Sequence, residues 1–340
     1  MEISKFIIIG ENIHCTRVFK RDGKRIKKID EQLIGIVYET NGKENILPIP
    51  DVFIKGNDWE SGKVKHCSVA IWQGMYGHDS EQQAGINYLQ SLARKQEKAG
   101  AAYLDVNVDE FSVDIEERVK AMEWLVPFVQ KASSLPLSID SSNEETMRAG
   151  LNACDTDRAR PMVNSISLER IALIDTAAEY KAAVVASAAG ENNLPTTAEE
   201  RLANFQRLIP QLMEKGIELS WIHADPLVYT ISTDSNNGKM FLESVAAVRR
   251  EYGPDIHIIG GLSNVSFGMP SRKLINQVFS WLAVEAGGDG GIVDPLQINA
   301  DILRALDTQS EPFKLAKELL LGKDEFGMNF ISAHREGKLS

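Results

Sequence analysis

The feature that most constrains the fold is a regular alternation of short apolar runs with amphipathic helical segments. Most of the runs are continuously apolar, which is typical of parallel strands covered on both faces. Helical spacing of apolar residues is clear in segments such as 115–132. The apolar runs lie at residues 6–10, 101–108, 135–140, 161–167, 182–189, 218–226, 257–264 and 290–295. Eight strands alternating with helices predict an α/β fold, a (β/α)8 TIM barrel.

A doubly wound open sheet is the alternative to the barrel. No G-x-G-x-x-G motif follows any of the apolar runs, so the dinucleotide-binding form of that fold lacks its fingerprint. Helix starts are marked by Ser and Asn at the beginning of the segment 142–154 and by Thr at the beginning of the segment 196–216. Pro210 predicts a kink in the second of these helices.

The spacing between the first two runs departs from the pattern of the barrel. Roughly ninety residues separate them, where a barrel unit needs about thirty. We interpret 16–78 as an insertion, with a β-hairpin turning at Asn41-Gly42, within a single domain spanning 1–340. Residues 79–100 then supply the helix before the second strand. The basic stretch 19–30 is either a solvated charged segment or a docking surface for an anionic partner.

Composition excludes several classes of function. The net charge of −11 argues against binding nucleic acid or an anionic membrane surface. No apolar run approaches the length of a membrane span, and the first residues show no signal-peptide pattern. Three cysteines in 340 residues do not form a disulfide framework. A cytoplasmic location is expected.

Acids and amides recur at the predicted carboxyl ends of the strands, where barrel enzymes build their active sites. Each one alone could serve equally well as a helix cap or turn residue. Together they would hydrogen-bond a neutral heterocycle rich in N–H donors, such as a pterin. These residues are Glu11, Asn12, Asp105, Asn107, Asp140, Asn143, Asn164, Asp225, Asn264 and Asp294.

Five motifs in order make the chain resemble the methyltetrahydrofolate:corrinoid methyltransferases, and with them the folate domain of B12-dependent methionine synthase. They are "GAAYLDVNV", "LSIDSSN", "MVNSIS", "WIHADPL" and "IIGGLSNVSFG", with "IIIGENIH" near the start. The resemblance implies a (β/α)8 barrel, a homodimer and a pterin bound at the barrel mouth.

The same resemblance implies roles for individual residues. Asn264 would be the catalytic residue, reaching N5 of the folate. Asp140 and Asp225 would hold the amino and ring N–H groups of the pterin, and Asn164 would bind the same ring. The remaining members of the implied pterin site are Asp105, Asn107, Glu11, Asn12, Asn143 and Ser266.

The implied activity is transfer of a methyl group between N5 of tetrahydrofolate and the cobalt of a corrinoid. The corrinoid (a cobalamin) would arrive on a separate corrinoid protein, and the direction of transfer stays open, as does the upstream donor, for example in O-demethylation. No resident metal ion is expected. Dihydropteroate synthase is a rival, but that family carries Ser-Arg-Lys where this chain has Ser263-Asn264-Val265. A non-catalytic folate-binding protein is the other alternative.

Some features depart from the family pattern or mislead. Phe267-Gly268 stands where the family often offers another polar side chain. Residues 255–260 satisfy D-x-H-x-x-G, the cobalt-ligating pattern, but too few residues follow for a cobalamin domain. The cysteines lack the spacing of a zinc site. His223 is either a proton donor near the pterin or a structural histidine.

Overall fold

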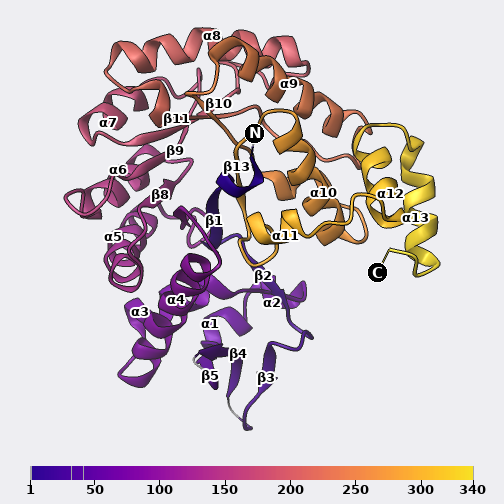
Figure 1. Ribbon diagram of the computed structural model, residues 1–340. Helices are drawn as coiled ribbons and strands as arrows, with labels where there is room; N and C mark the ends of the chain where they lie inside the picture. Colours follow the sequence, from indigo (N-terminus) through magenta and orange to yellow (C-terminus); the bar gives the residue numbers. More distant parts are fainter. Residues whose placement is uncertain (1, 32, 41, 340) are drawn as a thin grey trace. The chain divides into compact units, whose positions relative to one another are not determined.

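The computed structural model describes residues 2–31, 33–40 and 42–339. Its main sheet contains eight parallel strands in the hydrogen-bonded order β12-β11-β10-β9-β8-β7-β1-β13. Helices follow the strands along the chain (Figure 1). The strands are β1 (Ile7–His14), β7 (Tyr103–Asn107), β8 (Leu137–Asp140), β9 (Met162–Ile166), β10 (Ala183–Ser187), β11 (Ile222–Asp225), β12 (His257–Ile258) and β13 (Gly290–Val293).

The two strands at the ends of this order are joined by backbone hydrogen bonds. Asp289 N donates to Ile258 O at 3.0 Å, and Ile292 N donates to Gly260 O at 2.9 Å. The expected (β/α)8 barrel is therefore confirmed. Its helices are α4 (Ser80–Lys98), α5 (Ile115–Ala132), α6 (Glu144–Ala153), α7 (Leu173–Glu179), α8 (Ala198–Glu214), α9 (Asn237–Tyr252), α10 (Arg272–Glu285) and α11 (Ala300–Arg304).

Element boundaries differ from the expected ones in β1 and β12, while α8 begins at its predicted cap. β1 continues to His14, four residues beyond the predicted end, so Glu11 and Asn12 lie inside the strand. β12 is only two residues long, and its predicted remainder turns into a 3-10 helix (Leu262–Ser266). α8 begins with a capping box at Thr197 and runs on through Pro210 to Glu214.

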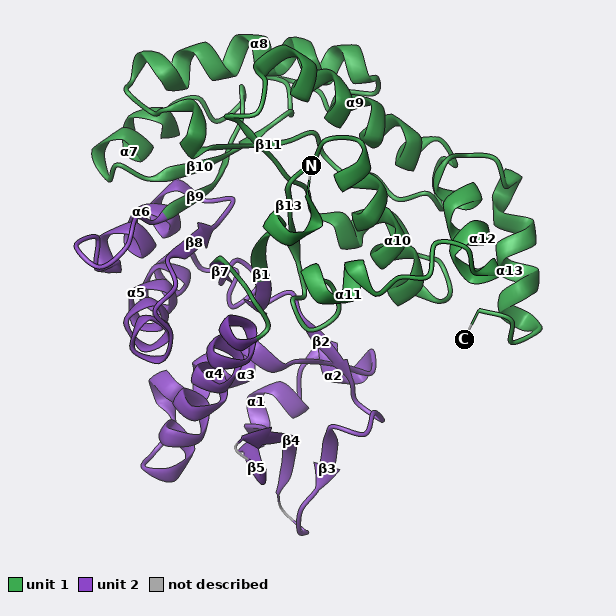
Figure 2. Ribbon diagram, in the orientation of Figure 1, with its two compact units in different colours: residues 1–10, 99–102, 162–340 green, residues 11–98, 103–161 purple. Residues whose placement is uncertain are grey.

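The chain divides into two compact units, which are described separately (Figure 2). Unit 1 comprises residues 1–10, 99–102 and 162–340. It contains β9 to β13 and ends in two helices beyond the barrel pattern, α12 (Glu311–Leu320) and α13 (Met328–Arg335). Its buried core is rich in Ile, Val, Leu and Phe from β10, α8, α9 and α10.

Unit 2 comprises residues 11–98 and 103–161, and it contains the insertion. The predicted hairpin is confirmed as the antiparallel pair of β4 and β5, while Asn41 of its turn lies outside the described residues. A helix not foreseen from the sequence, α3 (His66–Tyr76), packs on α4. The other insertion elements are β2 (Val18–Lys20), β3 (Ile26–Lys28), β4 (Ile34–Thr40), β5 (Lys43–Pro48), α1 (Asp51–Ile54), α2 (Asn57–Glu60) and β6 (Lys63–Lys65).

Several of the basic residues in 19–30 contact the insertion itself. Arg25 lies over the Phe19 ring at 4.9 Å, and Arg21 donates to Trp59 O at 3.0 Å. Lys27 forms an exposed ion pair with Glu44. These contacts favour the structural interpretation of that stretch.

No helix among the described residues is long and apolar enough to cross a membrane.

Candidate active site

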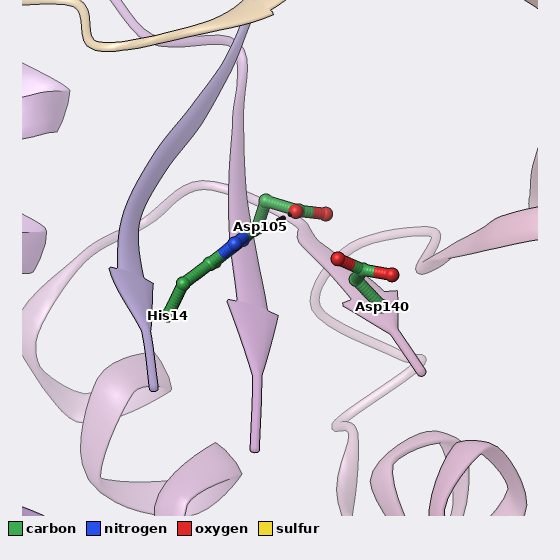
Figure 3. Close-up of side chains that lie close together, drawn as sticks. All are labelled: His14, Asp105 and Asp140. Carbon is green, nitrogen blue, oxygen red and sulfur yellow. Dashed lines mark hydrogen bonds and ion pairs between the residues drawn. The ribbon is translucent and has the colours of Figure 1, made fainter. Parts of the chain in front are cut away.

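Unit 2 gathers a cluster of polar side chains from the ends of three adjacent strands (Figure 3). The side chains of His14 on β1 and Asp105 on β7 point toward each other, with Nε2 and Oδ2 2.6 Å apart. Asn107, two residues further along β7, donates to Asp140 Oδ2 on β8 at 3.0 Å. The structure thus brings together the predicted Asp105, Asn107 and Asp140.

Charge is concentrated in this cluster. Burial opposes a charged imidazole, but the carboxylate of Asp105 and its hydrogen bond outweigh burial and raise the pKa of His14. Burial raises the pKa of Asp140 to about 7, and the nearby charge of Asp105 acts in the same direction. Asp140 therefore titrates near neutral pH, while its contact with Asp105 favours the protonated form of His14.

The same groups offer the donor types of a metal site. One ligand atom each from His14, Asp105 and Asp140 lie within 4.8 Å of one another. The imidazole and the Asp105 carboxylate are in direct contact at 2.6 Å, closer than ligand atoms held on one ion about 2.0–2.2 Å away. We interpret the cluster as an ion pair beside a carboxylate.

Two further predicted residues lie on β1. Glu11 forms an ion pair with Arg17, whose Nε also donates to the Glu11 carbonyl. The backbone of Asn12 is fixed on both sides: its N–H donates to Gln96 Oε1 at 3.0 Å, and its carbonyl accepts from the Cys67 thiol. These contacts hold the end of β1 against the insertion and α4.

The loops after β7 and β8 are tied together by a residue that the sequence did not single out. Asp109 accepts hydrogen bonds from the Ser141 and Ser142 hydroxyls and from the Ser142 N–H, all at 2.6–2.7 Å. Asn143 caps α6, accepting from Thr146 N at 2.9 Å. Its predicted contact with a pterin stays a prediction.

In unit 1, Asn264 lies in the 3-10 helix after β12 and is exposed. Its backbone is fixed by hydrogen bonds with Gly261 and Phe267. Among the described residues, no group hydrogen-bonds its side-chain amide. Asn264 lines a cavity of about 450 Å³, together with Val228, Tyr229, Thr230, Thr233, Asn237 and Phe267. The amide is therefore available to a ligand.

Asp225 ends β11, and its Oδ1 accepts from Leu227 N at 2.8 Å. Burial raises its pKa to about 6, while that N–H and the charge of Arg201 oppose the rise. Arg201 on α8 is fully buried and lies over the ring of Tyr229 at 4.9 Å. The burial of Arg201 was not predicted, because a single Arg near the start of an amphipathic helix usually lies on the solvated face.

Three other predicted residues lie in unit 1. Asn164 is 8% exposed on β9, and a cis peptide bond joins it to Ser165. Ser266 is fully buried and accepts from Arg272 Nε at 3.0 Å. Asp294, after β13, accepts from Leu296 N and from Gln297 Nε2.

The histidines of β11 and β12 form a separate stack. The rings of His223 and His257 have centroids 4.7 Å apart, and His257 Nδ1 bonds Asp289 at 2.9 Å. Burial lowers the pKa of His223 to about 3, so this histidine is neutral at pH 7. The structural interpretation of His223 is favoured. Cys15 and Cys67 are buried, and burial raises the pKa of both thiols.

Sequence analysis did not identify His14 as a functional candidate, although its spacing from Asn12 indicates one. It stands two residues after Asn12 in "GENIH", and alternate residues of a strand share a face. The predicted strand ends at residue 10, so the alternation of its side chains does not extend to His14 in the prediction.

Comparisons with known proteins agree on one family. A family model described as pterin binding enzyme matches residues 79–294, beginning just after the insertion. A methylcorrinoid:tetrahydrofolate methyltransferase of Eubacterium limosum is 31% identical over 258 residues, which is 74% of this chain and 89% of that protein. Methionine synthase of Mycobacterium tuberculosis is 32% identical over 224 residues, covering 61% of this chain but only 18% of the synthase.

Solved structures support the fold. Dihydropteroate synthase of Xanthomonas albilineans with 4-aminobenzoic acid superposes with a TM-score of 0.52 at 20% identity, covering 67% of this chain and 86% of the synthase. The same enzyme in complex with 7,8-dihydropteroate gives a TM-score of 0.50 at 18% identity, covering 66% of this chain and 89% of the synthase. By the family model and the 31% identical relative, the chain belongs to the pterin-binding enzymes, among the relatives of the methyltetrahydrofolate:corrinoid methyltransferases.

Proposed function

We propose that this protein transfers a methyl group between N5 of tetrahydrofolate and the cobalt of a corrinoid carried by a separate protein. The observation that carries the proposal is the 31% identity to a methylcorrinoid:tetrahydrofolate methyltransferase, extending over 89% of that relative. An exposed Asn264 amide facing a cavity agrees with it. The direction of transfer depends on which corrinoid protein is the partner.

The reaction needs little from the protein beyond stabilising one nitrogen. When the methyl group leaves N5, the electron pair of the N–C bond stays on N5, which takes up a proton from solvent to give tetrahydrofolate. The electron pair of Co(I) would form the new cobalt–carbon bond. An amide N–H aimed at N5 stabilises that electron pair more strongly in the transition state than in the ground state. Asn264 is suited to this because its backbone is fixed by the 3-10 turn while its amide has no partner among the described residues.

The ring would be recognised by acceptor groups. In this proposal, Asp140 and Asp225 accept the amino and ring N–H donors of the pterin, and Asn164 binds the same ring. Asp105 and Asn107 support Asp140, the latter through its 3.0 Å hydrogen bond. Ionised carboxylates accept such donors more strongly than neutral groups do.

A single-turnover assay tests the proposal. The protein is mixed with 5-methyltetrahydrofolate and free cob(I)alamin, and the loss of Co(I) absorbance is followed; methylcobalamin with tetrahydrofolate tests the reverse direction. Asn264→Ala should slow the transfer by about one to three powers of ten, the range for losing one transition-state hydrogen bond, with a smaller effect on pterin affinity.

Asn87→Ala provides a matched control, because Asn87 is an exposed asparagine on α4 that accepts from Gln83. This variant should transfer methyl groups at the wild-type rate. Tight binding of 5-methyltetrahydrofolate with no demethylation by the wild-type protein would instead identify a folate-binding protein without turnover. An unchanged rate in Asn264→Ala would remove that residue from the mechanism.

A further inference from the structure

His14 pairs with the buried Asp105, but it has no assigned part in recognising the pterin ring. The paired atoms are 2.6 Å apart, with the Asp105 side chain fully buried and that of His14 10% exposed. A charged pair is costly to bury, and such a pair gives less stability than apolar residues of similar size. We therefore expect the pair beside Asp140 to have a role other than stabilising the fold.

The carboxylates around this pair differ in their partners. Glu11 is paired with Arg17, and Asp105 is paired with His14. Asp140 accepts a hydrogen bond from the neutral amide of Asn107, and among the described residues no cation forms an ion pair with it. Asp140 is thus the member of the cluster whose charge a ligand can still compensate.

Without the charge on His14, two neighbouring buried carboxylates would face each other. Carboxylates this close do not both ionise readily, and they share a proton over a wide pH range. In the native protein, the charge of His14 acts on Asp140 as well, and it opposes the rise in the pKa of that carboxyl.

We propose that His14 is a positioning residue: its ion pair with Asp105 occupies that carboxylate, so that Asp140 is left ionised to accept the N–H donors of the pterin ring. This inference rests on the pterin binding in the proposed function, and it names His14 as the residue that favours an ionised Asp140 at neutral pH. His14 touches neither the ring nor the reacting atoms in this scheme.

Other titratable groups face the cluster and stay the same in every variant below. On β1, Glu11 is neutralised by Arg17. After β7, Asp109 adds negative charge near Asp140 but is bound by the Ser141 and Ser142 hydroxyls. A shift in pH dependence between variants therefore reports on His14 and Asp105.

The experiment measures the affinity for 5-methyltetrahydrofolate by calorimetry between pH 6 and pH 9. Wild-type affinity should weaken as the pH falls below about 7, where Asp140 takes up a proton. In His14→Asn, which keeps a polar group beside Asp105 but no charge, the midpoint should move up by about one pH unit. Affinity at pH 7 then falls about fivefold and recovers at pH 9. The exposed His78→Asn serves as control and should leave the midpoint unchanged.

A rescue variant separates charge from structure. Asp105→Asn removes the like charge beside Asp140 and also the carboxylate that raises the pKa of His14 against burial. Adding His14→Asn in that background should therefore no longer raise the midpoint. A merely structural role for His14 would weaken binding by the same factor at every pH, in both backgrounds, and would overturn the inference.

A second readout does not depend on binding. The imidazole resonances of His14, identified by their loss in His14→Asn, should titrate at a higher pH in the wild type than in Asp105→Asn; equal midpoints would overturn the inference. Absence of binding by the wild-type protein at any pH would overturn the proposed function, and the inference with it. Binding with an unmoved midpoint in His14→Asn overturns the inference alone.

Discussion

Gly261 lies directly beside the side-chain amide of Asn264, and the space between them has no room for a side chain. A Cβ placed on Gly261 would be 2.8 Å from Asn264 Nδ2. The atom in the way is the end of a mobile side chain, so Gly261→Ala should turn the amide aside without unfolding the loop. We expect methyl transfer to slow by about tenfold, a fraction of the loss for removing the amide.

The matched control is Gly56→Ala, because a Cβ there meets atoms only at ordinary distances of 3.4 Å and more. The single-turnover rate should be unchanged in this variant. Equal rates in Gly261→Ala and the wild type would show that the orientation of Asn264 is not restricted by Gly261.

The buried carboxylate of Asp225 lowers the free energy of unfolding at neutral pH. Burial raises its pKa to about 6, above the value near 3.9 of an unfolded chain. Below pH 3.9 both states are protonated and nothing is lost. Between about pH 4 and 6 the native state holds a proton that the unfolded state releases, so the cost of ionising Asp225 grows as pH rises and is complete above 6.

Asp225→Asn should therefore stabilise the free protein while it weakens pterin binding. The asparagine oxygen can still accept from Leu227 N, and the gain in unfolding free energy at pH 7 should be about 1–3 kcal/mol. Urea unfolding at pH 7 and pH 4 measures it. The gain should shrink toward zero at the lower pH, and a gain that is equal at both would contradict the burial argument.

At the scale of elements, α8 places a cation behind the strand end that carries Asp225. Arg201 is fully buried, donates to Ser244 on α9 at 3.3 Å and lies over Tyr229, which lines the cavity with Asn264. Its charge opposes the rise in the pKa of Asp225. The helix thereby acts on Asp225 through a buried side chain.

Arg201→Met should make Asp225 harder to ionise. If its pKa rises by two units from about 6, pterin affinity at pH 7 falls about tenfold, and it recovers at higher pH. Stability should change little, because an apolar side chain of similar length replaces a buried cation. Arg207→Met, on the exposed face of α8 where Arg207 pairs with Glu191, is the control. A loss of affinity that is constant with pH would contradict this role.

Most elements could be predicted from the sequence because their signals are local. The eight strands follow from continuous apolar runs, and the starts of α6 and α8 follow from Asn143 and Thr197 as caps. α3 was missed because its sequence, "HCSVAIWQGMY", is buried along most of its length and shows little helical periodicity. β12 is short because the turn at Gly260 and Gly261 begins directly after Ile258.

The candidate site was less predictable, since its interactions join residues far apart in the chain. The acids and amides at strand ends were identified by type, but the pairing of His14 with Asp105 spans 91 positions and depends on the length and register of β1. The burial of Arg201 depends on the packing of α8 against α9. Neither can be inferred from local pattern.

At the scale of the whole molecule, the insertion is the part whose contribution is least tied to the family. The family model begins at residue 79, after the insertion ends. The insertion has its own buried residues, Ile36, Leu47 and Ile49. Within it, Gln73 on α3 donates to Pro48 O, and Tyr38 contacts Tyr88 on α4. It therefore contributes packing to unit 2 without supplying any of the residues proposed to bind the pterin.

The antiparallel pair of β2 and β6 allows this to be tested, because Lys20 lies opposite Lys63. Replacing residues 21–62 with an Asn-Gly turn closes that pair as a two-residue hairpin. Pterin affinity should stay within about twofold of wild type, as expected for distant, independent sites. The unfolding free energy should fall by about 1 kcal/mol or more, because Tyr88 loses its edge contact with Tyr38. Tyr38→Ala in the full chain removes the same contact with Tyr88 and serves as the control. A folded, shortened chain that no longer binds 5-methyltetrahydrofolate would show that the insertion forms part of the site.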